Sequence, residues 1–333
     1  IKHKNNEKKQ LKLKLIIKKL DPILSNPSIL KVGQNIKYDL QILENNGFGI
    51  IYPLEDTMLM SYTLSAGLHN HNLDYLSEKY LSYKKISYKE IVGIGKKEIS
   101  FSEVEISKAS FYACEDADIT LKIWHIMKDL LIKEKLVSVY EYIEKPLIKV
   151  VANMEKNGIK VHKEKLELLS NSFSKQLDKL QKKIFFLAKS NFNINSTKQL
   201  GEVIFNKLQI PGGKKNKSGG FSTNSEVLES LSKQGFEIAS LILDWREISK
   251  LKSTYTISLT NNIFLKTKRV HSTFQMTGAQ TGRLSSTDPN LQNIPIKSKN
   301  GKEIRKAFVA DTGNKLVCFD YSQIELRLLA EIA

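Results

Sequence analysis

The sequence predicts a mixed α/β fold in two domains, and three observations lead to it. The first is length, because 333 residues suit two domains of roughly 100–200 residues each. The second is that, in the N-terminal part of the chain, short apolar runs alternate with stretches whose apolar residues have helical spacing, as in an α/β unit. The third is a change near Val137, after which helical patterns dominate. We therefore expect an α/β domain over residues 1–135 and a helical arm joined to a small sheet over 136–333.

The first domain is expected to alternate helices with short strands. Its basic, amphipathic start suits a surface helix, although a transit peptide or a membrane-surface helix has a similar pattern. The helix that ends at Asn46 is stopped by Gly47, a residue type that tolerates the left-handed conformation after a helix. In chain order we expect a helix at 11–20, a strand at 29–33, a helix at 35–46, a strand at 50–54, and helices at 56–65, 72–81 and 107–133.

The second domain is expected to be mainly helical. A first helix over 138–157 ends at Gly158, which again has the position of a C-terminal glycine. The stretch 211–220, PGGKKNKSGG, is glycine-rich and basic like a phosphate cradle, but it lacks the G-x-x-x-x-G-K-[ST] order. We expect a mobile loop that faces DNA. The other expected elements are helices at 163–190, 197–208 and 235–264, strands at 269–277 and 315–320, and a final helix.

The composition excludes several classes of protein. With 41% hydrophobic and 26% charged residues, the chain is too apolar for a disordered polycation and too charged for a membrane protein. It contains no run of about 18 apolar residues, so we expect no transmembrane helix and no membrane partner. Cys114 and Cys318 are the only cysteines, and their separation excludes a disulfide framework or a cysteine-based zinc site. Such cysteine usage suits a reducing compartment.

The net charge of +17 favours a polyanionic partner, because lysines near phosphates release counterions and attract DNA whatever its sequence. Part of this excess is a solvated lysine surface, since the many Lys, Asn and Ile residues suggest an AT-rich genome. Arginine is rare. Where lysine is the default, a remaining arginine points to a planar, bidentate role that lysine cannot fill. The five arginines are Arg246, Arg269, Arg283, Arg305 and Arg327.

Two local patterns could carry chemistry. Asp320 follows an apolar run, and a carboxylate at the end of a strand is costly unless it is paired or binds a cation such as Mg²⁺. Ser322 and Glu325 have the spacing of a helix capping box, and on spacing alone this cap is favoured over catalysis. Tyr112 and Asp116 are four residues apart on one helix face. They could hold a water and a metal, although such a pair is more often an ordinary surface feature.

Three segments of the second domain resemble family A DNA polymerases, the bacterial DNA polymerase I family. Residues 320–327, DYSQIELR, resemble the family's first catalytic motif. Residues 281–295, TGRLSSTDPNLQNIP, resemble its primer–template-binding motif, and residues 250–255, KLKSTY, resemble its DNA-contacting thumb helix. The catalytic motif and the primer–template-binding motif occur in the family's order and at about its spacing. A catalytic role for the segment that begins at Asp320 is therefore favoured over a simple helix cap. Gln280 departs from the pattern, because a small residue is expected there.

Two segments of the first domain resemble the 3′–5′ proofreading exonuclease of the same family. Residues 31–39, KVGQNIKYD, resemble its second motif, and residues 112–116, YACED, resemble its third. The family's first exonuclease motif, an Asp-x-Glu pair, is absent from the sequence. The resemblance therefore implies a partial ribonuclease H-like 3′–5′ exonuclease domain over 1–135, followed over 136–333 by a helical thumb and the first strands of a polymerase palm.

For polymerisation, the resemblance implies that Asp320 and the carbonyl of Tyr321 hold a metal in an in-line transfer assisted by two Mg²⁺ ions. Glu325 would lie beneath the incoming sugar and exclude a 2′-hydroxyl. Arg283 would enter the minor groove near the primer end, where acceptors are similar for every base pair, so it would check pairing geometry. The resemblance also implies that Ser322 and Gln323 contact the nucleotide. The residues implied to contact the DNA duplex are Asn290, Gln292, Asn293 and Arg305, and those implied to bind its phosphates are Lys252, Ser253 and Thr254. For Arg305 and for Arg327 a surface ion pair is an equal alternative.

For proofreading, the resemblance implies that Asp39 and Asp116 ligate two metals. Tyr112 would orient the attacking water, and Asn35 would contact the frayed single strand. The implied cofactor is Mg²⁺ in both sites. The implied partners are primer–template DNA and deoxynucleoside triphosphates, bound by a monomer.

The expected function is therefore DNA-directed DNA synthesis with an associated 3′–5′ exonuclease, in replication and repair. We expect a location in the bacterial cytoplasm, at the nucleoid, with an organellar origin also open. The chain starts at Ile1 rather than Met and ends at Ala333 within a helical pattern, so we expect a fragment that is inactive in both reactions. The alternatives are an exonuclease-only enzyme, which the intact Asp320, Glu325 and Arg283 disfavour, and a non-catalytic DNA-binding protein.

Overall fold

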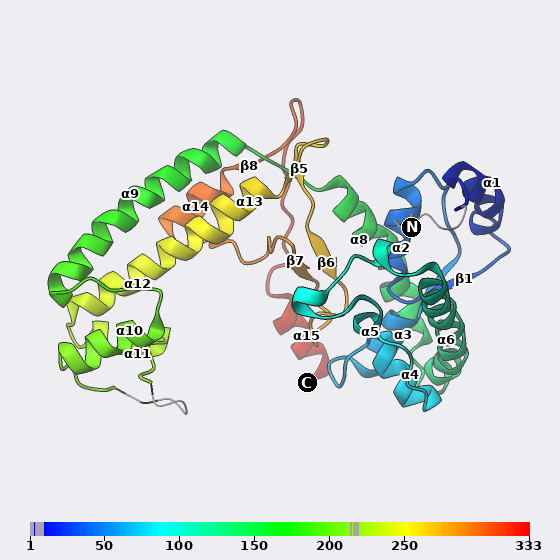
Figure 1. Cartoon of the computed structure of the whole chain (residues 1–333), viewed down its shortest axis with the longest axis horizontal. Coiled ribbons are helices and arrows are strands. Elements are labelled where there is room, and N and C mark those ends of the chain that lie inside the picture. Colours follow the sequence, from blue (N-terminus) through cyan, green and yellow to red (C-terminus); the bar gives the residue numbers. More distant parts are fainter. Residues whose placement is uncertain (1–2, 4–9, 214, 216–219) are drawn as a thin grey trace. The chain divides into compact units, whose positions relative to one another are not determined.

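The structure is a computed structural model that describes residue 3, residues 10–213, residue 215 and residues 220–333 (Figure 1). It divides into two compact units. Unit 1 comprises Ile1–Asn157 and Ser272–Asn290, and unit 2 comprises Gly158–His271 and Leu291–Ala333. Unit 1 therefore includes a segment that follows much of unit 2 in the sequence. The domain boundary that the sequence suggests between residues 135 and 136 stays a prediction.

Unit 1 is an arrangement of helices around two short pairs of strands. Its first helix has no buried residue, which confirms the expected surface helix. The predicted helices at 35–46, 56–65, 72–81, 107–133 and 138–157 are all present. The elements are α1 (Leu13–Leu24), β1 (Lys31–Gly33), α2 (Ile36–Asn45), β2 (Leu54–Asp56), α3 (Thr57–Ser65), α4 (Leu73–Leu81), α5 (Tyr88–Val92), η1 (Gly95–Lys97), η2 (Phe101–Glu103), α6 (Ile106–Lys133), α7 (Val137–Val139), η3 (Tyr140–Glu144), α8 (Lys145–Asn157), β6 (Thr273–Gln275) and β7 (Ser285–Thr287).

The core of unit 1 forms where α3, α4 and α6 pack together. Leu59, Leu76 and Ile123, one from each helix, are fully buried there. Strands β1 and β2 pair in parallel. The second strand begins later than the predicted 50–54, because Pro53 has no N–H to donate to a strand ladder. Strands β6 and β7 form a separate antiparallel pair.

A single buried carboxylate joins the starts of two helices in unit 1. Asp56 is 1% exposed, and its Oδ1 accepts the backbone N–H of Met58 at 2.9 Å and of Leu59 at 3.4 Å, which caps α3. The same side chain accepts the N–H of Asn35 at 3.0 Å and of Ile36 at 2.9 Å, at the start of α2. Four backbone donors that a helix cannot satisfy internally are thus satisfied by one residue.

Unit 2 consists of long helices and a four-stranded antiparallel sheet in the order β4-β5-β3-β8. The predicted helices at 163–190 and 197–208 are confirmed, and the one predicted at 235–264 ends at Asn261. Helix α9 runs alongside α12 (Figure 1). The elements are β3 (Ile159–Val161), α9 (Lys163–Ala188), α10 (Thr197–Gly201), η4 (Glu202–Lys207), α11 (Ser225–Lys233), α12 (Glu237–Lys250), η5 (Leu251–Ile257), α13 (Ser258–Asn261), β4 (Ile263–Phe264), β5 (Arg269–Val270), α14 (Lys299–Arg305), β8 (Phe308–Val309) and α15 (Ile324–Ile332).

Two predicted strands differ from the structure. The strand predicted at 269–277 is divided into β5 and β6 at Ser272, whose buried hydroxyl donates to Pro289 O at 2.7 Å. The strand predicted at 315–320 does not form: this stretch has no regular structure, and Phe319 is 92% exposed. A strand gains its stability from paired neighbours and a covered face, and no described strand pairs with this one. The predicted final helix is present as α15.

The predicted loop at 211–220 lies partly outside the described residues, and its mobility and contact with DNA stay predictions. In the part of the chain that the structure describes, no helix combines the length and apolar character needed to cross a membrane. Cys114 and Cys318 are both free and exposed, which agrees with the absence of a disulfide framework.

We predict that replacing Asp56 with alanine lowers the free energy of unfolding by about 2 kcal/mol, because it removes the caps of two helices. Urea denaturation measures this change. Asp118→Ala is the matched control, since Asp118 is 59% exposed and its ion pair with Lys122, on the same helix, is equally exposed. Such surface pairs contribute less than about 0.5 kcal/mol. Equal losses in the two variants would contradict the capping role of Asp56.

The same carboxyl predicts a pH dependence. Burial raises the pKa of Asp56 to about 6, although its four backbone N–H donors act to lower it. In the unfolded state the pKa of an aspartate is about 3.9. A carboxyl whose pKa is higher in the folded state stabilises the fold most at pH values below this unfolded-state pKa. Its contribution is lost as pH rises through about 6. The native protein should therefore lose stability relative to the Asp56→Asn variant between about pH 4 and 6, as urea titrations at several pH values would show.

Candidate nucleic-acid interface and metal sites

The residues that resemble the second exonuclease motif lie at the start of α2. Asn35 precedes the helix in the left-handed conformation, with φ of 55°, and its backbone is held by Asp56. Asp39 lies one turn later and has an exposed surface. The protein around its carboxyl still displaces enough water to raise its pKa, while a hydrogen bond from its own backbone N–H acts to lower it. The carboxyl of Asp39 is thus accessible to a ligand from solution.

The residues that resemble the third exonuclease motif are brought together on α6. The side chains of Tyr112 and Asp116 contact the same lysine, Lys85, so they lie on one face of the helix, as predicted. Burial, and then the nearby charge of Asp116, raise the pKa of Tyr112 well above its usual range. The phenol therefore stays protonated at neutral pH and can donate a hydrogen bond.

A buried lysine that sequence reasoning missed contacts this pair. Lys85 is 2% exposed in its side chain, and its Nζ lies 2.8 Å from Asp74 Oδ1 and 3.0 Å from Asp116 Oδ1. The Nζ also lies 5.0 Å from the centre of the Tyr112 ring. Burial acts to lower the pKa of Lys85, but its two carboxylate partners outweigh burial and raise it. Nothing in the sequence signals this role, because Lys85 is one lysine among many and is distant along the chain from Asp116.

The carboxylates of this region have the donor chemistry for a hard cation. Oδ1 of Asp116 is buried and has no hydrogen bond, and its contact with Lys85 is an ion pair only. Asp39 offers a second, accessible carboxylate, and carboxylate oxygens are the ligands that Mg²⁺ prefers. No group of three or more His, Cys, Asp or Glu side chains is placed to share a metal among the described residues. Asp39 and Asp116 thus each offer a carboxylate, and their joint role as metal ligands stays a prediction.

Arg283, of the primer–template-like motif, is exposed in the turn that joins β6 to β7. Gly282 before it has φ of 76°, a conformation that glycine adopts without strain. Farther along, Ser286 donates to Asn290 Oδ1 at 3.4 Å. The unexpected Gln280 also has an explanation, because its Nε2 donates to Gly67 O at 3.3 Å. Its side chain fills the space in which a Cβ on Gly67 would lie.

Two of the predicted DNA-contacting segments lie next to each other in unit 2. Lys252, Ser253 and Thr254 are on η5, and the buried Tyr255 that follows anchors this helix. The Tyr255 hydroxyl donates to Asn293 O at 2.5 Å. That bond places the exposed Gln292–Asn293 stretch beside the thumb-like helix, although the two segments are far apart in sequence. Arg305, at the end of α14, is exposed as well.

The segment that resembles the first catalytic motif is entirely exposed. Asp320 and Tyr321 lie in irregular structure rather than at the end of a strand. The predicted capping box is wrong, because the N-cap of α15 is Gln323, with φ of 50° and no side-chain cap. Ser322 instead uses its carbonyl, which accepts from Arg327 Nε at 3.1 Å. This bond gives Arg327 a backbone partner.

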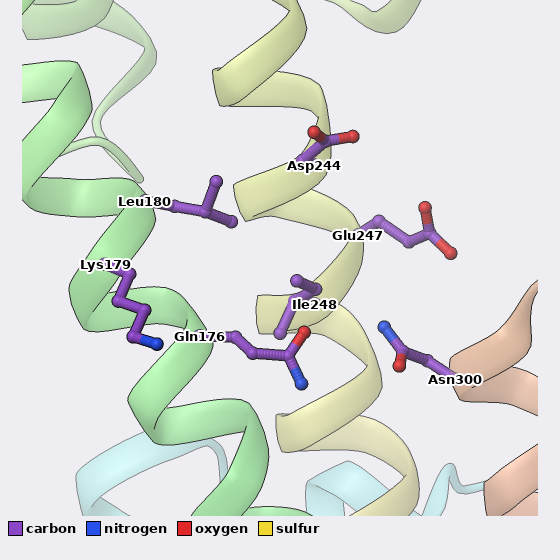
Figure 2. A pocket seen from close by; sticks show the side chains of 7 residues that line it. All are labelled: Gln176, Lys179, Leu180, Asp244, Glu247, Ile248 and Asn300. Carbon is purple, nitrogen blue, oxygen red and sulfur yellow. The ribbon is translucent and has the colours of Figure 1, made fainter.

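A pocket of about 400 Å³ in unit 2 lies away from all these residues. Figure 2 shows side chains from α9, α12 and α14 around it, and they are Gln176, Lys179, Leu180, Asp244, Glu247, Ile248 and Asn300. None of the residues singled out from the sequence lines it. This pocket is therefore not the candidate site.

Comparisons with known proteins match both parts of the chain. Residues 163–333 match the family model of DNA polymerase family A, and residues 1–132 match a 3′–5′ exonuclease model. DNA polymerase I of Rhizobium leguminosarum is 45% identical over 97% of this chain and 32% of its own length. DNA polymerase I of Borreliella burgdorferi is 41% identical over 96% of this chain and 34% of its own length. The chain thus spans about a third of these curated relatives.

A solved structure is similar as well. The POL domain of Pol1 from M. smegmatis, in complex with DNA primer-template and dNTP, has a TM-score of 0.78 and 30% sequence identity. The match covers 93% of this chain and 51% of that one.

We predict that Lys85→Met lowers the free energy of unfolding by about 2 kcal/mol, because it leaves the carboxylates of Asp74 and Asp116 without their shared cation. Urea denaturation measures the loss. Lys122→Met is the control, because its ion pair with Asp118 is exposed and contributes less than about 0.5 kcal/mol. A triple variant that also carries Asp74→Asn and Asp116→Asn should recover most of the stability. No recovery would contradict the electrostatic explanation.

Proposed function

Because the chain belongs to DNA polymerase family A, we propose that the protein that contains it synthesises DNA on a template and removes mispaired 3′ ends with its exonuclease domain. The observation that carries this proposal is that one chain matches the exonuclease model over residues 1–132 and the polymerase model over residues 163–333. The proposed substrates are primer–template DNA and deoxynucleoside triphosphates.

For nucleotide addition, we assign catalysis to the exposed segment that begins at Asp320. Its carboxylate and the carbonyl of Tyr321 are the proposed oxygen ligands of Mg²⁺. Bound Mg²⁺ acidifies the primer 3′-hydroxyl and balances the charge of the triphosphate. Ser322 and Gln323 are proposed to contact the nucleotide. The side chain of Glu325 is proposed to exclude a ribose by occupying the space of its 2′-hydroxyl.

For DNA binding, we propose that the two neighbouring segments of unit 2 contact the duplex together. Lys252, Ser253 and Thr254 bind phosphates, which positions the duplex without reading its sequence. Gln292 and Asn293, held beside them by Tyr255, add polar contacts, as do Asn290 and Arg305. The excess positive charge of the chain, +17, supports this assignment because it attracts DNA electrostatically.

For proofreading, we propose that Asp39 and Asp116 are two of the ligands of a Mg²⁺ pair and that Tyr112 orients the attacking water. The position of Tyr112 beside Asp116, with Lys85 in contact with both, supports the role, because a phenol can donate a hydrogen bond to the water oxygen. Asn35, at the edge of the same unit, is proposed to contact the single strand.

We further propose that the protein acts as a monomer in the bacterial cytoplasm, on nucleoid DNA. The support is that the curated relatives that match it are bacterial DNA polymerases I. The free, exposed thiols of Cys114 and Cys318 suit a reducing compartment.

We predict that Asp320→Asn in the complete protein lowers the rate of primer extension by a factor on the order of 1,000, because it removes a metal-binding carboxylate while retaining the side-chain shape. Primer extension on a matched template measures the rate. Affinity for primer–template DNA, measured by fluorescence anisotropy, should stay unchanged. Near-normal extension by this variant would refute the assignment of Asp320.

We predict that Arg283→Ala slows extension about tenfold from a matched primer end and more from a mismatched end. A mismatch already weakens the other contacts to the terminal pair, so loss of the arginine has a larger effect there. Single-nucleotide extension from paired substrates that differ only in the terminal base measures both rates. Lys302→Ala, which removes an exposed cation of unit 2, is the control and should leave the ratio of the two rates unchanged.

A further inference from the structure

The turn that carries Arg283 is held by unit 1, the unit that contains the exonuclease match. The segment Ser272–Asn290 packs with Ile1–Asn157, although residues 163–333 together match the polymerase model. Strand β6 contacts α8, and Phe274, Met276 and Leu284 belong to the apolar core of unit 1. Residues 272–290, which belong to the polymerase match, thus pack within the exonuclease-like unit.

One anchor of the segment is a buried ion pair. Lys37 on α2 and Glu155 on α8 form this pair, and each side chain is 8% exposed. The pair also binds both backbone polar groups of Phe274. The N–H of Phe274 donates to Glu155 Oε1 at 2.6 Å, and its carbonyl accepts from Lys37 Nζ at 2.8 Å. The start of β6 is therefore fixed at one residue by two charged groups.

The second anchor lies at the turn itself. Tyr62 on α3 is 3% exposed, and its hydroxyl donates to Ala279 O at 2.6 Å. The same hydroxyl accepts the backbone N–H of Gly282 at 3.0 Å. One phenol oxygen thus bridges the two sides of the turn, and Gly282 is the residue directly before Arg283. The Tyr62 ring is in turn held edge-on by His71, with ring centres 5.6 Å apart.

We propose that Tyr62 is a positioning residue for Arg283, so that the exonuclease-like unit sets where the polymerase contacts the primer end. This inference rests on the proposed function. Arginine has a long, flexible side chain, and its placement depends on how firmly its backbone is held. Small displacements of a contacting group are costly to the rate of reaction. Tyr62, which supplies this bridge, lies 220 residues before Gly282 in the sequence.

The first test measures the bridge without any enzyme activity. Tyr62→Phe retains the ring, and therefore the packing of α3, but removes the oxygen that accepts the Gly282 N–H. Amide hydrogen exchange should become about tenfold faster at Gly282, the effect of one lost hydrogen bond. Tyr142→Phe is the matched control, because Tyr142 is 82% exposed and should change nothing. Gln280→Ala, at the exposed side of the same turn, should give a smaller increase.

The second test measures the consequence for the primer end, in the complete protein. Tyr62→Phe should slow extension from a mismatched end more than from a matched end, as expected for Arg283→Ala. In the Arg283→Ala background, Tyr62→Phe should have no further effect, because it acts through the arginine. Equal effects in both backgrounds would refute the positioning role, as would unchanged exchange at Gly282.

The two tests fail in different ways. A complete protein that does not extend primers refutes the proposed function, whereas the exchange rate at Gly282 still tests the bridge. Faster exchange at Gly282 with unchanged primer extension would overturn the coupling to Arg283. Equal unfolding midpoints for Tyr62→Phe and the native protein ensure that neither readout reports a general loss of stability.

Discussion

The ion pair between Lys37 and Glu155 is the constraint on which the arrangement of unit 1 depends. Two nearly buried charges are costly unless each has well-placed partners. Glu155 also accepts from the side chain of Gln41 and from the N–H of Phe274, and Lys37 donates to the Phe274 carbonyl. The pair is therefore fully bonded only when β6 is in place. A segment that is distant in sequence completes the polar interior of the exonuclease-like unit.

This dependence explains why the compact units do not follow chain order. A boundary read along the sequence must fall at one position, but Ser272–Asn290 joins the first unit after 114 residues of the second. The division occurs where Ser272 is buried and bonds to Pro289 O, so the two ends of the segment are tied together.

Local patterns in the sequence predicted most helices but few of the contacts that matter at the candidate sites. The 3.6-residue spacing of α6 was visible because Ile119 and Ile123 face one core. The prediction of a strand at 315–320 was wrong, since an apolar run forms a strand only with paired neighbours. The capping box was wrong as well, because the N-cap of α15 is Gln323 and not Ser322. Lys85 and Tyr62 were missed because Asp116 lies 31 residues from Lys85, and Ala279 and Gly282 lie more than 200 residues from Tyr62.

Hydrogen bonding separates the structural carboxylates from the candidate ligands. Asp56 and Glu155 are buried, and the backbone or side-chain donors around them leave little capacity for a cation. Asp116 is only partly buried and keeps an oxygen without a hydrogen bond, while Asp39 is exposed. A carboxylate can bind a metal only if it can exchange its present partner for the ion, and water or a single ammonium is easier to replace than several fixed N–H groups. By this criterion Asp39 and Asp116 keep more capacity to bind a ligand than Asp56 and Glu155 do.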